Sequence, residues 1–116
     1  MRVLVCGGRH YDNPAAVYAA LGSICRVDGR ITCVIHGGAS GADNLADAWG
    51  VKNGITVESY LADWHVFGRA GGPLRNQRML DEGKPDIVLA FPGGRGTEDM
   101  VTRAKKAGVR VLRVMV

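Results

Sequence analysis

Long apolar runs, paired cysteines and aromatic residues are what this sequence has least of. No run reaches the roughly 18 to 20 apolar residues of a membrane span, and the first strand-like segment meets glycines too early for a signal peptide. Cys6, Cys25 and Cys33 are odd in number, lack C-x-x-C spacing and lie among apolar neighbours. We therefore expect a soluble, cytoplasmic protein with buried, reduced thiols and no metal site.

Two familiar nucleotide-binding motifs are also missing. There is no G-x-G-x-x-G after the first apolar run and no G-x-x-x-x-G-K-[ST] anywhere, which argues against an ordinary dinucleotide-dependent dehydrogenase and a P-loop NTPase. The chain does carry a net charge of +4, and 11 of its 15 basic residues are arginines. Because arginine binds phosphate and carboxylate groups in bidentate geometry, this balance favours anionic partners.

The apolar pattern predicts one α/β domain over residues 1–116. Short apolar runs at 2–6, 31–36, 55–61, 86–90 and 109–114 are typical of buried strands. Segments with helical spacing separate most of them, one beginning at Asn13 (N-cap) and Pro14, another at Pro73. Such alternation predicts a Rossmann-like, three-layer αβα domain with a five-stranded parallel sheet, the last strand lying at an edge.

Three glycine-rich loops follow predicted strands, at residues 7–9, 37–41 and 93–97. The carboxyl ends of parallel strands meet at one edge of a sheet, where ligands bind. In the third loop, glycines open into a helix, whose free N–H groups and dipole favour an anion. Here Thr97 is expected to cap the helix or to donate its hydroxyl to a ligand, and Arg95 to add a charge.

Other residues have two interpretations each. Ser40 and Asp43 have the spacing of a capping box, although Asp43 could instead bind a ribose hydroxyl. His36 is expected to be a hydrogen-bonded structural residue. Arg75 and Arg78 lie one helical turn apart, on the surface or as an anion clamp. Residues 62–72 show neither helical nor strand periodicity, and an aromatic loop of this length favours a functional role.

Four segments together resemble a known family: V-C-G-G-R at 5–9, V-I-H-G-G-A-S-G-A-D at 34–43, G-P-L-R-N-Q-R-M at 72–79 and A-F-P-G-G-R-G-T at 90–97. The combination resembles the SLOG superfamily of Rossmann-like proteins, and more narrowly its small YspA-type members. The resemblance implies strand order 3-2-1-4-5, a pocket for a nucleotide, ADP-ribose or NAD-like ligand, and a homodimer. The candidate ligand-binding residues are Gly7, Gly8, Arg9, Gly37, Gly38, Ser40, Gly41, Asp43, Arg75, Arg78, Pro92, Gly93, Gly94, Arg95, Gly96 and Thr97.

The SLOG resemblance extends to the LOG phosphoribohydrolases, once misnamed lysine decarboxylases. These enzymes cleave the bond between the base and the ribose 5′-monophosphate of a nucleotide. Their P-G-G-x-G-T-x-x-E signature matches over residues 92–97, and Arg75 with Met79 matches R-x-x-x-M in the preceding helix. A nucleoside 5′-monophosphate hydrolase is therefore the alternative function that the resemblance implies.

The sequence departs from the hydrolase signature at two positions. Met100 stands where the signature has its glutamate, and Asn76 replaces a lysine. Methionine cannot orient water or stabilise an oxocarbenium-like charge, so a hydrolase would have to use Glu98 or Asp99 together with Arg75.

Three functions remain open from the sequence. The first is binding or sensing of a nucleotide-derived ligand, with phosphate on the amides of residues 94–97 and the base stacked on Tyr11 or Trp64. The second is the hydrolase. The third is binding of single-stranded nucleic acid through basic residues and stacking on Trp64 or Phe67, since SLOG relatives include a DNA-processing protein. We rank ligand binding first, with no further cofactor and no membrane partner.

Overall fold

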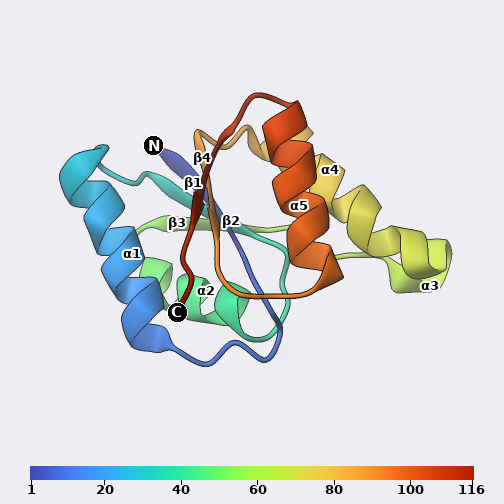
Figure 1. The fold of residues 1–116 in the computed structure, drawn as a ribbon, viewed down its shortest axis with the longest axis horizontal. Helices are drawn as coiled ribbons and strands as arrows, with labels where there is room; N and C mark the ends of the chain where they lie inside the picture. The colour runs from blue at the N-terminus through green and yellow to red at the C-terminus, as the bar shows by residue number, and fades with distance from the viewer.

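Five parallel strands form one sheet in the computed structural model, which describes residues 1–116 (Figure 1). The strands are β1 (Arg2–Cys6), β2 (Cys33–His36), β3 (Thr56–Ser59), β4 (Ile87–Ala90) and β5 (Arg110–Arg113). They lie in the order β3-β2-β1-β4-β5, and every neighbouring pair is parallel. The predicted α/β fold and strand order are therefore confirmed.

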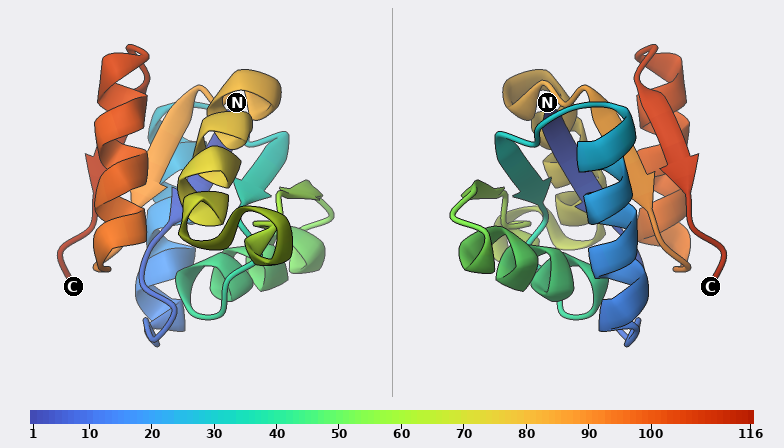
Figure 2. Two further views of the ribbon diagram at one scale, coloured as in Figure 1. Left: turned by 90° about the vertical axis from the view of Figure 1, so that its right-hand side faces the viewer. Right: turned by 90° about the vertical axis from the view of Figure 1, so that its left-hand side faces the viewer.

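Helices cover both faces of the sheet (Figure 2). They are α1 (Pro14–Val27), α2 (Ala42–Lys52), α3 (Trp64–Phe67), a 3₁₀ turn η1 (Gly68–Ala70), α4 (Gly71–Gly83) and α5 (Arg95–Lys106). The apolar stripes of α1 and α2 pack in one core cluster, and those of α4 and α5 pack in another. None of these helices has the length and apolar character that crossing a bilayer requires.

Strand β1 is the centre of both cores. Val3, Leu4 and Val5 are fully buried because helices cover the sheet on both sides. Successive side chains alternate between the faces, so Val3 and Val5 pack with α1 and α2, whereas Leu4 and Cys6 pack with α4 and α5. Strand β1 therefore connects the two core clusters through the middle of the sheet.

The edge strands β3 and β5 are more exposed. The predicted edge position of the last strand is confirmed, with Arg110 and Arg113 exposed at its two ends. Arg110 pairs with Asp28 at 2.5 Å, and Arg113 pairs with Glu98 at 2.7 Å. Charged residues on an edge strand disfavour pairing with another chain's strand.

Local signals were correct at some helix starts and wrong at others. Asn13 caps α1 by accepting a hydrogen bond from the Ala16 N–H at 3.1 Å, as predicted. Pro73 does not begin α4, which starts two residues earlier at Gly71. Residues 62–72, predicted to be an aperiodic loop, contain α3 and η1; the Asp63 side chain caps α3 by accepting from Val66 N–H. A four-residue helix is too short to show a 3.6-residue period.

The loops that follow β1, β2 and β4 meet at the backbone of Gly8. Its N–H donates to the carbonyl of Pro92 at 2.9 Å, and its own carbonyl accepts from the Ala42 N–H at 3.4 Å. A side chain at Gly41 would overlap that carbonyl, and a side chain at Gly93 would overlap the Gly8 nitrogen. Glycine is therefore required at both positions so that the three backbones can approach one another.

Replacing Gly41 with alanine should destabilise the fold more than the same change at Gly54. Both residues have positive φ, 78° and 67°, so alanine costs a similar backbone strain of roughly 1 kcal/mol at each. Only at Gly41 does the new methyl group overlap the Gly8 backbone, because nothing lies within 4 Å at Gly54. Urea titration should give an unfolding free energy at least about 2 kcal/mol lower for Gly41→Ala than for Gly54→Ala. Equal losses would show that the loops do not need this contact.

Candidate functional site

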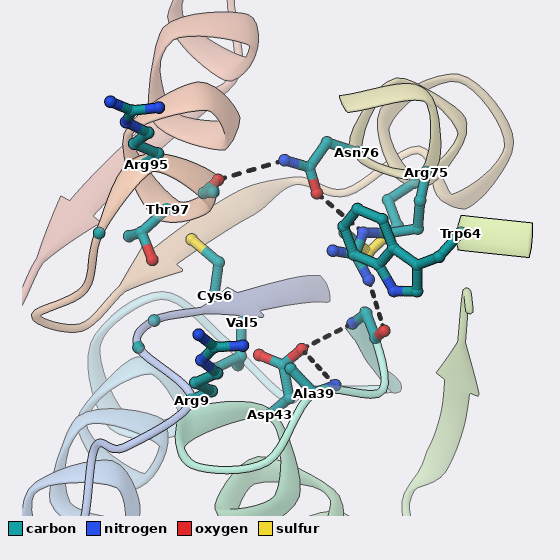
Figure 3. Close-up of a pocket in the computed structure, with 16 residues that line it drawn as sticks. Val5, Cys6, Arg9, Ala39, Asp43, Trp64, Arg75, Asn76, Arg95 and Thr97 are labelled. Carbon is teal, nitrogen blue, oxygen red and sulfur yellow. Dashed lines mark hydrogen bonds between the residues drawn. The ribbon is translucent and has the colours of Figure 1, made fainter. Parts of the chain in front are cut away.

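A cavity of about 340 Å³ opens at the carboxyl edge of the sheet (Figure 3). The chain winds to opposite sides from β1 and β4, and in open parallel sheets ligands bind where the winding reverses. The candidate residues that line the cavity are Gly7, Gly8, Arg9, Gly37, Asp43, Arg75, Gly94, Arg95, Gly96 and Thr97. The structure thus brings residues from all three glycine loops and from α4 to one place.

The remaining candidates lie outside the cavity lining. These are Gly38, Ser40, Gly41, Arg78, Pro92 and Gly93. Several of them build the loops instead: the Ser40 hydroxyl donates to the Arg9 carbonyl at 2.9 Å, and Gly38 adopts a φ of 75°. Arg78 is exposed and pairs with Glu82 at 2.9 Å, so the two arginines of α4 do not form a clamp.

The N-terminus of α5 borders the cavity. Gly94 occupies the N-cap position, and no side chain caps the helix. The first hydrogen bond runs from the Glu98 N–H to the Gly94 carbonyl at 3.1 Å, so the earlier amides lack intrahelical partners. The predicted capping role of Thr97 is wrong because Thr97 is the third residue of the helix. Uncapped amides and the helix dipole together favour an anion at this end of the cavity.

Gly94 and Gly96 differ from the other glycines of these loops. Neither has a positive φ, and an added Cβ at either position would meet no atom within 4 Å. Glycine within a helix costs roughly 1 kcal/mol relative to alanine, and Gly96 is the second residue of α5. Nothing within the protein therefore requires glycine at position 96. Gly94 is different, because its φ of −103° and ψ of −142° lie outside the α and β regions that other residues favour.

The arginines of the cavity are not neutralised by carboxylates. Arg9 and Arg95 are exposed and form no ion pair. Five other arginines pair with acids: Arg2 with Glu58, Arg78 with Glu82, Arg103 with Asp99, Arg110 with Asp28 and Arg113 with Glu98. The guanidinium groups of Arg9 and Arg95 therefore remain available to an anion in the cavity.

Arg75 and Asn76 connect α4 to the loop that follows β2 and to the first turn of α5. The Arg75 guanidinium donates to the Gly37 carbonyl at 2.5 Å and to the Asn76 side-chain oxygen at 3.0 Å. The Asn76 amide donates to the Gly96 carbonyl at 3.2 Å and to Asp99 at 2.9 Å. Burial lowers the pKa of Arg75, and the charge of Asp43 acts in the opposite direction. Asn76 was not predicted as a site residue; its place beside Arg75 in the same helical turn was the available signal.

Asp43 does not form the predicted capping box with Ser40. Gly41 occupies the N-cap position of α2, and one Asp43 oxygen, Oδ2, accepts from the N–H groups of Gly37 at 3.0 Å and Ala39 at 3.2 Å. Asp43 is only 5% exposed, and it is the only carboxylate that lines the cavity. Burial raises the pKa of Asp43, against the lowering effect of these N–H groups, His36 and Arg75.

His36 has the structural role that was expected. Its Nδ1 accepts from the Gly38 N–H at 2.9 Å, and its Nε2 lies 2.7 Å from an Asp47 oxygen. With Nδ1 an acceptor, the proton of the neutral ring must lie on Nε2, which donates to Asp47. The two contacts of His36 hold the turn that carries Gly37.

The two proposed catalytic carboxylates lie outside the cavity lining. Glu98 is exposed and pairs with Arg113, which lowers the pKa of Glu98 through their hydrogen bond. Asp99 accepts from Asn76 and from Arg103, each at 2.9 Å. Met100, at the position of the signature glutamate, is 1% exposed in the core.

Of the aromatic candidates, Trp64 alone lines the cavity. Its ring packs against the start of α4, where a Cβ at Gly72 would lie 2.8 Å from it. Tyr11 instead packs on Phe91, with ring centres 5.2 Å apart, and its hydroxyl donates to the Val116 carbonyl. Base stacking on Tyr11 is therefore not favoured by its position.

Cys6 also lines the cavity, which was not predicted, although its place directly before Gly7 was a signal. Burial raises the pKa of the Cys6 thiol to about 12, so it stays protonated and is a poor nucleophile. All three cysteines are free, and Cys6 and Cys33 are buried. The structure brings together no group of three or more His, Cys, Asp or Glu side chains that could hold a metal ion.

Two comparisons relate this chain to known proteins. Residues 1–67 match the family described as "YspA, cpYpsA-related SLOG family". The chain is also 40% identical over 118 aligned residues to the Gene 61 protein of Mycobacterium phage D29, an alignment that covers 96% of this chain and 94% of the phage protein. The similarity to the phage protein therefore extends over almost the whole of both chains.

The raised pKa of Asp43 predicts a pH-dependent stability. Between the unfolded-state pKa of about 3.9 and the higher native pKa, the native state binds a proton that the unfolded state has lost. The unfolding free energy of the wild type should therefore fall relative to Asp43→Asn as the pH rises through this window. The expected loss is about 1.4 kcal/mol per unit of pKa difference. Urea titrations of both proteins between pH 4 and pH 8 measure it. A wild-type unfolding free energy that stays level or rises relative to that of Asp43→Asn across this range would contradict the assignment.

Proposed function

This chain belongs to the YspA, cpYpsA-related SLOG family, and we propose that its cavity binds or senses a nucleotide or nucleotide-derived ligand. The phosphate lies on the first turn of α5, and the base lies against Trp64. A volume of about 340 Å³ is near the lower end of the range of about 300–1,000 Å³ for small-molecule pockets. It favours one nucleotide unit inside, with the rest of an ADP-ribose or NAD-like ligand extending outward.

The observation that carries this proposal is Gly96, the second residue of α5. It lines the cavity, its helical backbone angles are open to any residue, and no protein atom lies where a methyl group would be placed. A ligand that approaches the backbone closely explains why a side chain is absent there. An anion is the chemistry that matches, because the adjoining amides are uncapped and belong to a helix N-terminus.

The charged and aromatic groups support a nucleotide over a simple anion. Arg9 and Arg95 have no carboxylate partners and are free to bind phosphate oxygens. Trp64 lies across the cavity from Thr97 and Arg95 in Figure 3, and offers an aromatic surface for a base. Phosphate and base would thus occupy opposite ends of the same cavity.

The placement of the acidic residues favours binding over cleavage. A glycosidic hydrolase needs a carboxylate near the bond that breaks. Glu98 and Asp99 are held by arginines away from the cavity, and Met100 is in the core. The hydrolase with Glu98 or Asp99 as its carboxylate is therefore the weaker proposal. Single-stranded nucleic acid is also less favoured, because only one aromatic side chain lines the cavity and successive bases need several.

Calorimetric titration of the purified protein with AMP, ADP-ribose and NAD tests the proposed function. We expect at least one of them to bind with a Kd well below 1 mM. A Kd of 1 mM corresponds to a binding free energy of about −4.1 kcal/mol. If none binds more tightly than this at low ionic strength, the proposal is wrong. Release of free base from AMP during the titration would move the assignment to the hydrolase.

The substitution Gly96→Ala should separate binding from stability. The added methyl group meets no protein atom, and alanine favours the helix, so the unfolding free energy should stay equal or rise by up to about 1 kcal/mol. Binding of the ligand found in the titration should weaken at least about tenfold, since the methyl group lies where the phosphate approaches the amides.

Gly22→Ala in α1 is the matched control. This glycine is also in a helix, and its added Cβ would touch only the end of the Arg26 side chain, at 3.4 Å. It lies outside the cavity, so the change should leave ligand affinity unaltered. A Gly96→Ala protein with wild-type affinity would remove the main support for the phosphate position.

A further inference from the structure

Asp43 offers the cavity one oxygen that no group of the chain donates to. The residue is 5% exposed, and its Oδ2 accepts both backbone N–H groups, from Gly37 and Ala39. Figure 3 shows Oδ1 directed away from the two N–H groups, toward the side of the cavity from which Arg9 projects, and Arg9 forms no ion pair with it. Oδ1 is open to the cavity, since no side-chain oxygen of the protein is both buried and without a partner. A ligand in the cavity can therefore donate a hydrogen bond to this oxygen.

The topology places this oxygen and the phosphate position on two sides of the cavity. Asp43 follows β2, and the first turn of α5 follows β4, with β1 between the two strands. Between them β1 ends in Gly7 and Gly8, which line the cavity without side chains. The space between the two positions is therefore open to the middle of a ligand.

A ribose hydroxyl fits this position. In a 5′-nucleotide, the phosphate and the 2′- and 3′-hydroxyls are joined through C5′, C4′ and the ring carbons. The ribose of such a ligand lies between its phosphate and its base. Figure 3 shows Thr97 and Trp64 on opposite sides of the cavity, with Asp43 on the wall below and between them, where the ribose of a ligand held at both ends would lie. A metal ion is not favoured, because Asp43 belongs to no group of three or more acidic, histidine or cysteine side chains that could hold one.

We propose that Oδ1 of Asp43 accepts a hydrogen bond from a ribose hydroxyl of the ligand, so that the site selects ribonucleotides over nucleotides that lack these hydroxyls. This inference rests on the proposed function and assigns the class of ligand for the same cavity. Hydrogen bonds to a charged acceptor are the stronger kind, and a ligand without the hydroxyl leaves the carboxylate oxygen unpaired. Both effects favour the ribonucleotide over the ligand that lacks the hydroxyls.

Calorimetry of the full chain with AMP, GMP, CMP and UMP, and with their 2′,3′-dideoxy counterparts, tests the inference. For each base that binds, we expect the ribonucleotide to bind at least about tenfold more tightly than its dideoxy analogue. Equal binding of the two series would overturn the role of Asp43 and leave the phosphate site standing. Failure of all eight compounds to bind would overturn this inference, whereas the proposed function falls only if ADP-ribose and NAD also fail to bind.

The variant Asp43→Asn identifies the residue responsible. The asparagine oxygen can still accept from Gly37 and Ala39, but a neutral amide then faces the ligand in place of the carboxylate. The preference for ribonucleotides should fall to about threefold or less, whereas binding of the dideoxy analogues should not weaken. Asp81→Asn is the control, because Asp81 is exposed on α4 and accepts a hydrogen bond only from Gln77. The Asp81→Asn protein should prefer ribonucleotides as strongly as the wild type does. An unchanged preference in Asp43→Asn would refute the assignment.

A wild-type measurement covers the case in which Asp43→Asn does not fold. The carboxyl ¹³C resonance of Asp43, assigned through bonds, should shift when the ribonucleotide binds and shift much less when the dideoxy analogue binds. The phosphate is common to both ligands, so its charge does not contribute to this difference. Identical shifts with the two ligands would overturn the inference without any substitution.

Discussion

The approach of three backbones at Gly8 is the constraint on which the site depends. Gly8 donates to Pro92 and accepts from Ala42, and Gly41 and Gly93 lack the side chains that would separate the loops. Because these loops follow the central strands of one sheet, their meeting places Arg9, Asp43 and the start of α5 around one cavity. The sheet provides the rigid support, since β1 is buried on both faces. The glycines allow the three loop backbones to approach one another.

Polar contacts complete the cavity in two different ways. His36, Asp43 and Arg75 use their hydrogen bonds to hold the backbone of residues 37–39, so these side chains are partly committed to structure. The amides of α5, together with Arg9 and Arg95, have no such commitments. The cavity therefore has a fixed loop at residues 37–39 and unpaired donors at α5. Such a site is preorganised for an anion, because binding requires little rearrangement. This is the physical content of the proposed nucleotide site.

The sequence predicted the fold and the three glycine loops of the cavity because those features depend on local patterns. Apolar runs, glycine loops and the helix start at Asn13 and Pro14 are each encoded within a few residues. The contacts of Asn76 and Trp64 depend instead on other segments: Asn76 reaches Gly96, and Trp64 packs against Gly72. The direction of Glu98 likewise follows from its pairing with Arg113, fifteen positions away. At Ser40 and Asp43 the spacing matched a capping box, but the carboxylate accepts hydrogen bonds from the N–H groups of Gly37 and Ala39 in the preceding loop instead.

The most direct test of this account is a ¹H–¹⁵N NMR titration of the protein with AMP, which reports each backbone amide separately. The account predicts that the largest shifts fall on the amides of residues 7–9, 37–43 and 94–97, and that the indole N–H of Trp64 shifts with them. Shifts confined to the groove between α4 and α5, lined by Gln77, Asp99 and Lys106, would contradict it. So would a spectrum that does not change at millimolar nucleotide.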